Sequence, residues 1–221
     1  MKQYLAFITI ALLAIGTTSC HKKVLRGEGP TITETRFVGE FSKIEANGSA
    51  RVVVVEDDDY SVIVTGYGNL IPMYETKVNG DRLVLQYKDR FWNVRNDNIT
   101  VEVHTPFVDK VSLNGSGNIS IGSGFDQTRL MTDINGSGNI YVSGSKYNSV
   151  SADINGSGTF DSENSDVNNV YISISGSGDA YVSVNEYLKV NINGSGDVYY
   201  RGDPGRVETS ISGSGKVHKR N

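Results

Sequence analysis

Apolar and polar residues alternate without a break through residues 111–121, which read VSLNGSGNISI. One parity carries Val, Leu, Gly, Gly, Ile and Ile in that order, and the other carries only Ser and Asn. A period of two predicts β-strands with one buried face. Gly115 and Gly117 fall on the buried parity, where a strand that turns sharply toward its own core has no room for a Cβ atom and where Gly permits φ > 0. The segment is therefore expected to form a strand, a Gly-Ser-Gly bend and a second strand.

This pattern is present in six copies at a period of 18 to 21 residues. The copies of Gly-Ser-Gly begin at Gly115, Gly136, Gly156, Gly176, Gly194 and Gly213. A seventh copy, residues 44–54 (IEANGSARVVV), lies upstream and has Ala50 in place of the second glycine. Each repeat predicts one coil, with two strands around a bend and then a polar return of about ten residues. The chain is therefore expected to be all-β and to fold as a right-handed single-stranded β-helix, or solenoid.

Stacked coils place equivalent residues of successive repeats next to one another. The position two before each first glycine then forms an apolar row of Leu113, Ile134, Ile154, Ile174, Ile192 and Ile211, which we expect in the core. The position directly before that glycine forms a polar row of Asn114, Asn135, Asn155, Ser175, Asn193 and Ser212. Such a row could bind a ligand, but hydrogen bonds from coil to coil are the favoured interpretation.

The segment between the seventh copy and the other six also indicates β structure. Residues 60–66 (YSVIVTG) and 98–106 (NITVEVHTP) are expected to form strands. Asn79 and Gly80 stand between two apolar runs within residues 76–88, which is the typical signature of a β-hairpin. These elements are expected to broaden and cap the N-terminal end of the solenoid. The mature chain shows no convincing helical pattern.

The N-terminus has the pattern of an export signal. Lys2 precedes an apolar run at residues 5–15, which is too short to span a bilayer as a helix. The run leads to GTTSC, where Cys20 is the only cysteine of the chain and rules out an internal disulfide. We predict a signal peptide over residues 1–19 and a lipidated Cys20, with an ordinary secretory signal and a stray cysteine as the alternative. Residues 20–36 are interpreted as a polar tether, residues 37–215 as the β-helix domain and residues 216–221 as a solvated basic tail.

Motifs for catalysis, cofactors and metals are missing from the sequence. The net charge is −4 and no long run of like charges occurs, so we expect no nucleic-acid partner. The run EDDD at residues 56–59 is interpreted as a charged turn, and no cofactor or metal site is expected. We therefore predict a protein that is not an enzyme. A polysaccharide-active enzyme stays an alternative, since Asp133, Asp153 and Asp161 are outward residues of neighbouring coils.

Aromatic residues supply the candidate contact sites. The outward position after each bend carries Ser120, Tyr141, Asp161, Tyr181, Tyr199 and His218. Tyr141, Tyr181 and Tyr199 could contact a glycan or a protein, although aromatic pairs that stabilise a sheet are the commoner arrangement. Trp92, the only tryptophan, lies in an expected loop and would serve either as a contact residue or as a cap over the core.

Four features together resemble the putative auto-transporter adhesin family with the head GIN domain. They are the segments FSKIEANGSARVVVVE, VNGDRLVLQ and ITVEVHTPFVDKVSLNGSGNI and the run of Gly-Ser-Gly copies, and the resemblance covers residues 37–215. It implies a β-helix domain of Gram-negative cell-envelope proteins, often lipoproteins, that is similar to pectin-lyase-type helices but lacks their catalytic residues. No site residues of the family carry over to this chain.

These observations favour an outer-membrane lipoprotein, held to the membrane by its lipid anchor, that presents a rigid β-helix to glycan or protein ligands. The domain would lie on the cell surface or on the periplasmic side. The absence of acidic residues in HKK, directly after Cys20, tilts the expectation weakly toward the periplasmic side. The alternative is a periplasmic scaffolding lipoprotein without an external ligand.

Overall fold

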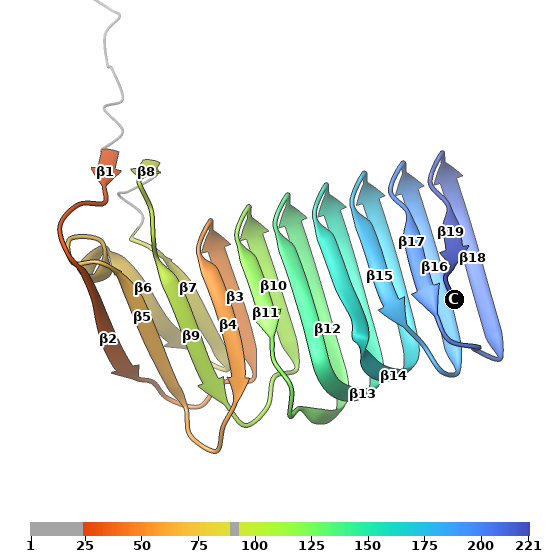
Figure 1. Ribbon diagram of the computed structural model, residues 1–221, viewed down its shortest axis with the longest axis horizontal. Coiled ribbons are helices and arrows are strands. Elements are labelled where there is room, and N and C mark those ends of the chain that lie inside the picture. The colour runs from red at the N-terminus through yellow and green to blue at the C-terminus, as the bar shows by residue number, and fades with distance from the viewer. Residues whose placement is uncertain (1–23, 89–92) are drawn as a thin grey trace, which may run out of the picture.

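The computed structural model describes residues 24–88 and 93–221, and it is a β-solenoid with a broadened N-terminal end (Figure 1). The N-terminal strands are β1 (Val24–Arg26), β2 (Thr31–Phe37), β3 (Lys43–Gly48), β4 (Arg51–Glu56), β5 (Ser61–Tyr67), β6 (Tyr74–Asn79), β7 (Arg82–Tyr87), β8 (Asn93–Arg95) and β9 (Thr100–Thr105), with one 3-10 turn, η1 (Ile71–Met73). The repeats supply β10 (Lys110–Gly115), β11 (Asn118–Ile121), β12 (Asp126–Gly136), β13 (Asn139–Gly156), β14 (Thr159–Gly176), β15 (Asp179–Ser183), β16 (Tyr187–Gly194), β17 (Val198–Arg201), β18 (Arg206–Gly213) and β19 (Val217–Lys219). Within the described ranges, no helix is long and apolar enough to cross a bilayer.

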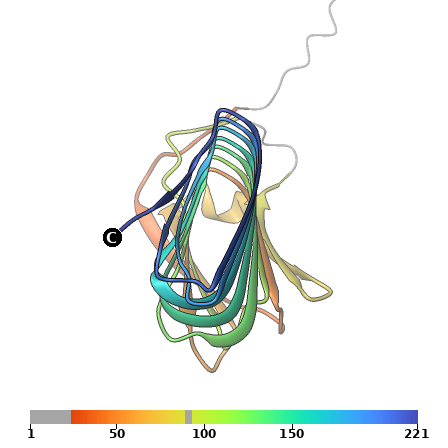
Figure 2. The ribbon, with the colours of Figure 1, turned by 90° about the vertical axis from the view of Figure 1, so that its right-hand side faces the viewer.

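Each coil is flattened and has two walls that meet at the Gly-Ser-Gly corner (Figure 2). The first wall contains β3, β10, β12, the later parts of β13 and β14, β16 and β18, all parallel and in register. The second wall contains β4, β11, the first parts of β13 and β14, β15, β17 and β19. Gly48 pairs with Gly115, which confirms that residues 44–54 are the seventh copy.

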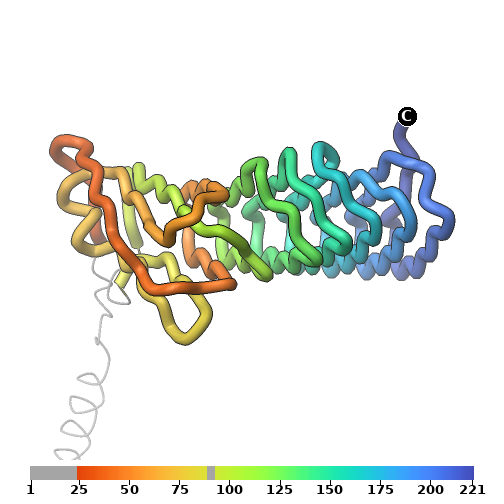
Figure 3. Tube along the Cα trace, turned by 90° about the horizontal axis from the view of Figure 1, so that it is seen from below, coloured from red at the N-terminus to blue at the C-terminus, as the bar shows by residue number. Residues whose placement is uncertain are grey.

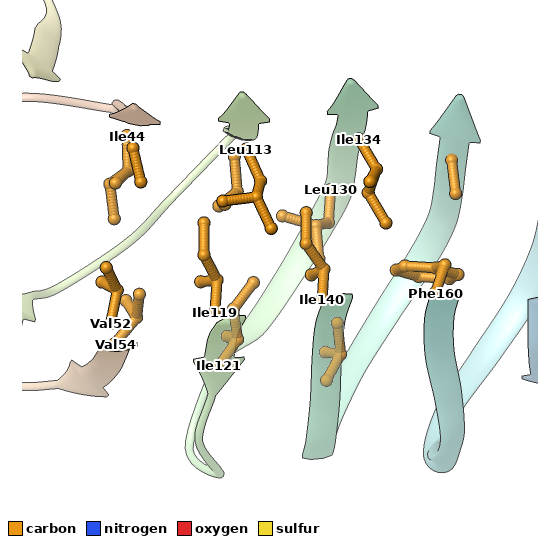
Figure 4. Packing of buried hydrophobic residues seen from close by; sticks show 14 of the residues in the cluster. Ile44, Val52, Val54, Leu113, Ile119, Ile121, Leu130, Ile134, Ile140 and Phe160 are labelled. Carbon is orange, nitrogen blue, oxygen red and sulfur yellow. The ribbon is translucent and has the colours of Figure 1, made fainter. Parts of the chain in front are cut away.

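The core lies between the two walls, as the alternation predicts. The apolar row pairs residue by residue from Leu113 to Ile211. Its members up to Ile192 are at most 2% exposed, and they face the apolar row of the second wall that contains Ile119, Ile140 and Phe160 (Figure 4). Ile211 is 43% exposed because it belongs to the last coil, over which no further coil stacks. Burial between stacked coils therefore supplies the hydrophobic stabilisation of this fold.

The corner glycines are required for a reason that the alternation alone did not give. The sequence interpretation placed the missing room inside the core, and this holds for the second glycine in part, since a Cβ atom on Gly138 would lie 2.6 Å from Cδ2 of Leu113. The obstacle that both glycines share is the backbone of the preceding coil. A Cβ atom on Gly136 would lie 2.4 Å from the carbonyl oxygen of Gly115, and one on Gly138 would lie 2.4 Å from that of Gly117. Gly136 also has φ +131°, a conformation that only glycine adopts without strain. Close stacking of the corners therefore excludes side chains at both positions.

The polar row before each corner forms an amide ladder, as predicted. Asn114 Nδ2 donates to Asn47 Oδ1 over 2.8 Å, and Asn135 Nδ2 donates to Asn114 Oδ1 over 2.9 Å. Asn155 continues the ladder with a bond of 3.2 Å to Asn135, after which the row changes to Ser175. The amide ladder is defined here as Asn47, Asn114, Asn135 and Asn155. Its side chains satisfy one another along the stack, which favours the structural interpretation over a ligand-binding row.

The inserted strands cap the N-terminal end. The hairpin β6–β7 turns at Asn79 and Gly80, as expected, and projects beside the stack (yellow in Figure 3). β7 pairs with β3, so it extends the first wall, and β9 pairs with β4, so it extends the second. β5 then pairs with β9. These contacts confirm the expectation that the insertion broadens and closes this end.

Two boundaries of the domain differ from the sequence prediction. Residues 31–36 were assigned to the tether, but β2 pairs along its whole length with β5, and Arg36 donates to the carbonyl oxygens of Tyr74 and Ile71 over 2.7 and 2.9 Å. The basic tail likewise contains β19, which pairs with β17. β2 is exposed along nearly all of its length and so lacks the buried face that the alternation detects. β19 is only three residues long, and its Val217 and His218 are half-buried.

Candidate functional site

The predicted outward row runs along the second wall. Successive coils contribute Ser120, Tyr141, Asp161, Tyr181, Tyr199 and His218. The rings of Tyr181 and Tyr199 stack with centroids 5.0 Å apart, and Tyr199 stacks on His218 with centroids 4.9 Å apart. Tyr141 is 40% exposed, and Asp161 separates it from Tyr181 in the row. The structure therefore brings two of the three predicted tyrosines together and leaves the third apart.

The stack of Tyr181, Tyr199 and His218 offers ring edges to solvent more than ring faces. The planes of Tyr181 and Tyr199 differ by only 7°, so each ring covers a face that a sugar would use for stacking. The guanidinium of Arg220 lies 5.8 Å from the centroid of the Tyr181 ring. Arg220 and Arg201 both bind Glu163, over 3.0 and 3.1 Å. This geometry favours a role in stabilising the sheet.

A second feature, which the sequence interpretation missed, is a hollow at the first corner. The backbone pairing of β7 with β3 ends at Leu85 and Ala46, next to this hollow. The hollow has a volume of about 530 Å³ and is named here the outer groove. It is lined by Asn47, Gly48, Ser49, Gln86, Tyr87, Lys88, Asn93, Val94, Gly115 and Ser116. Its size lies within the range typical of small-ligand sites.

Polar side chains hold the walls of the outer groove in place. Asn47 Nδ2 donates to Gln86 Oε1 over 3.0 Å, so the amide ladder reaches the groove. Asp97 accepts hydrogen bonds from Tyr87 Oη over 2.7 Å and from Ser49 Oγ over 3.2 Å. Burial and the hydrogen bond to Asp97 raise the pKa of the Tyr87 phenol. Tyr87 therefore stays protonated and fixed, with its hydroxyl already committed.

The charged segment after β4 forms a turn, as predicted, and closes on His104. His104 Nδ1 lies 2.9 Å from Asp57 Oδ2, and its Nε2 lies 2.8 Å from Glu102 Oε1. Burial opposes the charged imidazole, but the two carboxylates outweigh it and raise the pKa of His104. Within residues 24–88 and 93–221, no cluster of three or more histidine, cysteine or acidic side chains has the arrangement of a metal site.

Two of the three carboxylates considered for glycosidase chemistry, those of Asp133 and Asp161, are engaged in structural contacts. Asp133 Oδ2 lies 2.6 Å from Lys110 Nζ and accepts a hydrogen bond from Ser112 Oγ over 3.0 Å. Asp161 Oδ1 accepts a hydrogen bond from the amide of Glu163 over 2.9 Å. Two further candidates, Cys20 and Trp92, lie outside the described residues.

The amino-acid sequence of the chain matches a known protein family. A sequence model of that family, described as "Putative auto-transporter adhesin, head GIN domain", matches residues 40–204. The chain belongs to this family. The match agrees with the resemblance seen in the sequence and spans most of the solenoid. No curated protein shows significant sequence similarity to the chain.

Solved structures similar to this family member share its solenoid. A putative adhesin from Bacteroides fragilis NCTC 9343 has 22% identity and a TM-score of 0.70, and the match covers 89% of this chain and 100% of that one. A putative adhesin from Parabacteroides distasonis ATCC 8503 has 21% identity and a TM-score of 0.61, with 90% and 100% covered. A putative lipid binding protein from the same strain has 21% identity and a TM-score of 0.57, again with 90% and 100% covered. At these identities the similarity establishes the fold alone.

Proposed function

We propose that this protein is a non-enzymatic lipoprotein of the outer membrane that uses its solenoid to adhere to glycan or protein ligands. The observation that carries the proposal is membership of an adhesin family across residues 40–204. The parallel walls support it, since stacked coils hold outward rows of side chains at a fixed spacing over the length of the domain. Cys20, directly after the apolar N-terminal run, would be the acylated residue.

Lipid attachment is tested by metabolic labelling with a fatty-acid analogue. The full chain is expressed in a Gram-negative host, and the Cys20→Ala variant serves as the control. Label should enter the wild-type protein and not the variant, and the wild type should fractionate with the outer membrane. Equal labelling of the two proteins, or none in either, would contradict the anchor.

Adhesion is tested by binding of the purified domain to an array of glycans and matrix proteins. The domain should bind a defined subset of the array. Protease treatment of intact cells then distinguishes the two locations, because a surface adhesin is cleaved while a periplasmic protein survives. Survival together with an array that shows no binding would favour the periplasmic scaffold. Release of reducing ends from a panel of polysaccharides would instead favour an enzyme.

A further inference from the structure

The first corner, residues 48–50, differs from the six Gly-Ser-Gly corners that follow it. In each later coil, the serine amide donates to the carbonyl oxygen of the first glycine one coil earlier, over 2.8 to 3.1 Å. In three of these corners the amide of the second glycine, Gly117, Gly138 or Gly215, donates to the same oxygen over 3.0 to 3.2 Å. In these three corners, two convergent backbone amides therefore hold one oxygen atom.

At the first corner, these donors lack their oxygen. Among the residues that the structure describes, the amides of Ser49 and Ala50 have no hydrogen-bond partner. Gly48 has φ +121°, close to the +131° to +145° of the later corners, so the backbone keeps a similar shape. A Cβ atom added to Gly48 would meet nothing within 4 Å, whereas the equivalent atom of every later corner would strike the preceding coil. The space that a Cβ atom on Gly48 would enter is therefore open.

That space adjoins the outer groove, whose lining suits a sugar. Gln86, Asn93 and Ser116 supply amide and hydroxyl groups. The Tyr87 hydroxyl is committed to Asp97, so its ring offers carbon surface to a ligand. Lys88 adds a positive charge, although its Nζ also donates to the carbonyl oxygen of Pro72 over 2.7 Å. Neighbouring backbone amides that converge in this way form an anion-binding concavity.

We propose that the outer groove binds an acidic saccharide. A carboxylate oxygen of the sugar would accept hydrogen bonds from the amides of Ser49 and Ala50, in the position that a glycine carbonyl occupies in each later coil. The inference rests on the proposed adhesive function and names a ligand class for it. A peptide is the weaker candidate because β7 pairs with both β3 and β6, and β9 with both β4 and β5. No edge of either strand is left for an added strand.

Amide NMR titration of the folded domain tests the assignment directly. The probes are cellobiouronic acid and cellobiose, which differ in a single carboxylate. The acid should shift the resonances of Ser49 and Ala50, and cellobiose should bind at least tenfold more weakly. Equal shifts with both sugars, no shift at Ser49, or a stronger response to an acetylated tripeptide would each overturn the proposal.

Two pairs of matched variants extend the test. Ala50→Pro removes one donor, whereas Ala50→Gly keeps the amide and restores the residue of the later corners. Affinity for the acid should fall at least tenfold in the first and stay within twofold in the second. Ser116→Trp fills the outer groove from an exposed position, and Ser137→Trp places the same side chain one corner further on. Only Ser116→Trp should abolish binding, and this pair decides the question if Ala50→Pro does not fold.

The array experiment separates failure of this assignment from failure of the proposed function. If the wild type and Ser116→Trp bind the same array members equally well, adhesion stands and the outer groove is not its site. If the wild type binds no array member and no acidic sugar, both proposals fail.

Discussion

Asn135 donates a hydrogen bond of 2.9 Å from its Nδ2 to Oδ1 of Asn114, one coil earlier. It also accepts a bond of 3.2 Å from Asn155, so its amide joins three coils. Each such bond contributes about 1 kcal/mol net. Asn135→Ala should therefore lower the free energy of unfolding by about 1 to 2 kcal/mol, measured by urea denaturation. The control is Asn193→Ala, since Asn193 has serine neighbours in the row and makes no side-chain hydrogen bond within the described residues. A loss as large in the control would contradict the role of the ladder.

Substitutions at the corner glycines distinguish the energetic cost of backbone strain from that of a steric clash with the preceding coil. Gly48 and Gly136 both have positive φ, but only a Cβ atom on Gly136 collides with the preceding coil. Gly48→Ala should cost about 1 to 2 kcal/mol, which is the strain of a left-handed backbone alone. Gly136→Ala should cost at least about 3 kcal/mol or prevent folding, because the carbonyl of Gly115 cannot move without disturbing the stack. Thermal unfolding measures both, and equal losses would show that strain alone explains the motif. Gly115→Val should destabilise for the same reason, since its Cβ would lie 2.4 Å from Gly48 O.

The same geometry explains the one copy that departs from Gly-Ser-Gly. A Cβ atom on Gly117 would lie 2.5 Å from the carbonyl oxygen of Ala50, whereas Ala50 itself has no earlier corner beneath it. Alanine is therefore tolerated at the first coil only. The substitution is visible in the sequence and marks the start of the stack. Its link to the outer groove was hidden, because the groove is lined by residues far apart in the chain, such as Asn47 and Gln86.

The alternation of residues predicts the elements that have one buried face. The apolar row from Leu113 to Ile192 and the turn at Asn79 and Gly80 were both found as expected. β2 was missed because it has no buried apolar face. Its side chains are exposed, and Thr33, for example, forms a hydrogen bond with Thr65 of β5. The reason for the glycines was found only in part, since the contact with the backbone of the preceding coil was not foreseen. The alternation of apolar and polar residues shows which face of the strand a residue occupies. It does not show how closely the preceding coil approaches that residue.

Tyr199 tests whether the aromatic row is structural or forms contacts. Its ring stacks on both Tyr181 and His218, and each aromatic pair contributes about 0.5 to 1.5 kcal/mol. Tyr199→Ala should therefore lower the free energy of unfolding by about 2 kcal/mol. Tyr199→Phe keeps the stack and should stay within about 0.5 kcal/mol of the wild type. If Tyr199→Phe abolishes binding to the array at unchanged stability, the hydroxyl is a contact and the purely structural role is wrong.

His104 makes stability depend on pH. Hydrogen bonds to Glu102 and Asp57 raise its pKa against the effect of burial, so folding favours the charged imidazole. The stabilisation is then fully present below about pH 6.5, the ordinary pKa of histidine, and is lost as the pH rises through the raised value. At acid pH, the hydrogen bond to His104 lowers the pKa of Asp57. That contribution is present above the ordinary pKa of an aspartate and is lost as the pH falls through the lowered value.

His104→Gln should abolish the decline in stability above about pH 6.5 that we expect for the wild type in urea denaturation. NMR titration of the imidazole should give a pKa above about 6.5 in the wild type. Glu102→Gln removes the carboxylate that faces Nε2 over 2.8 Å and should lower that pKa, while Asp57 keeps the ring in place through Nδ1. A pKa that does not change in Glu102→Gln, or a decline that persists in His104→Gln, would place the pH dependence elsewhere in the molecule.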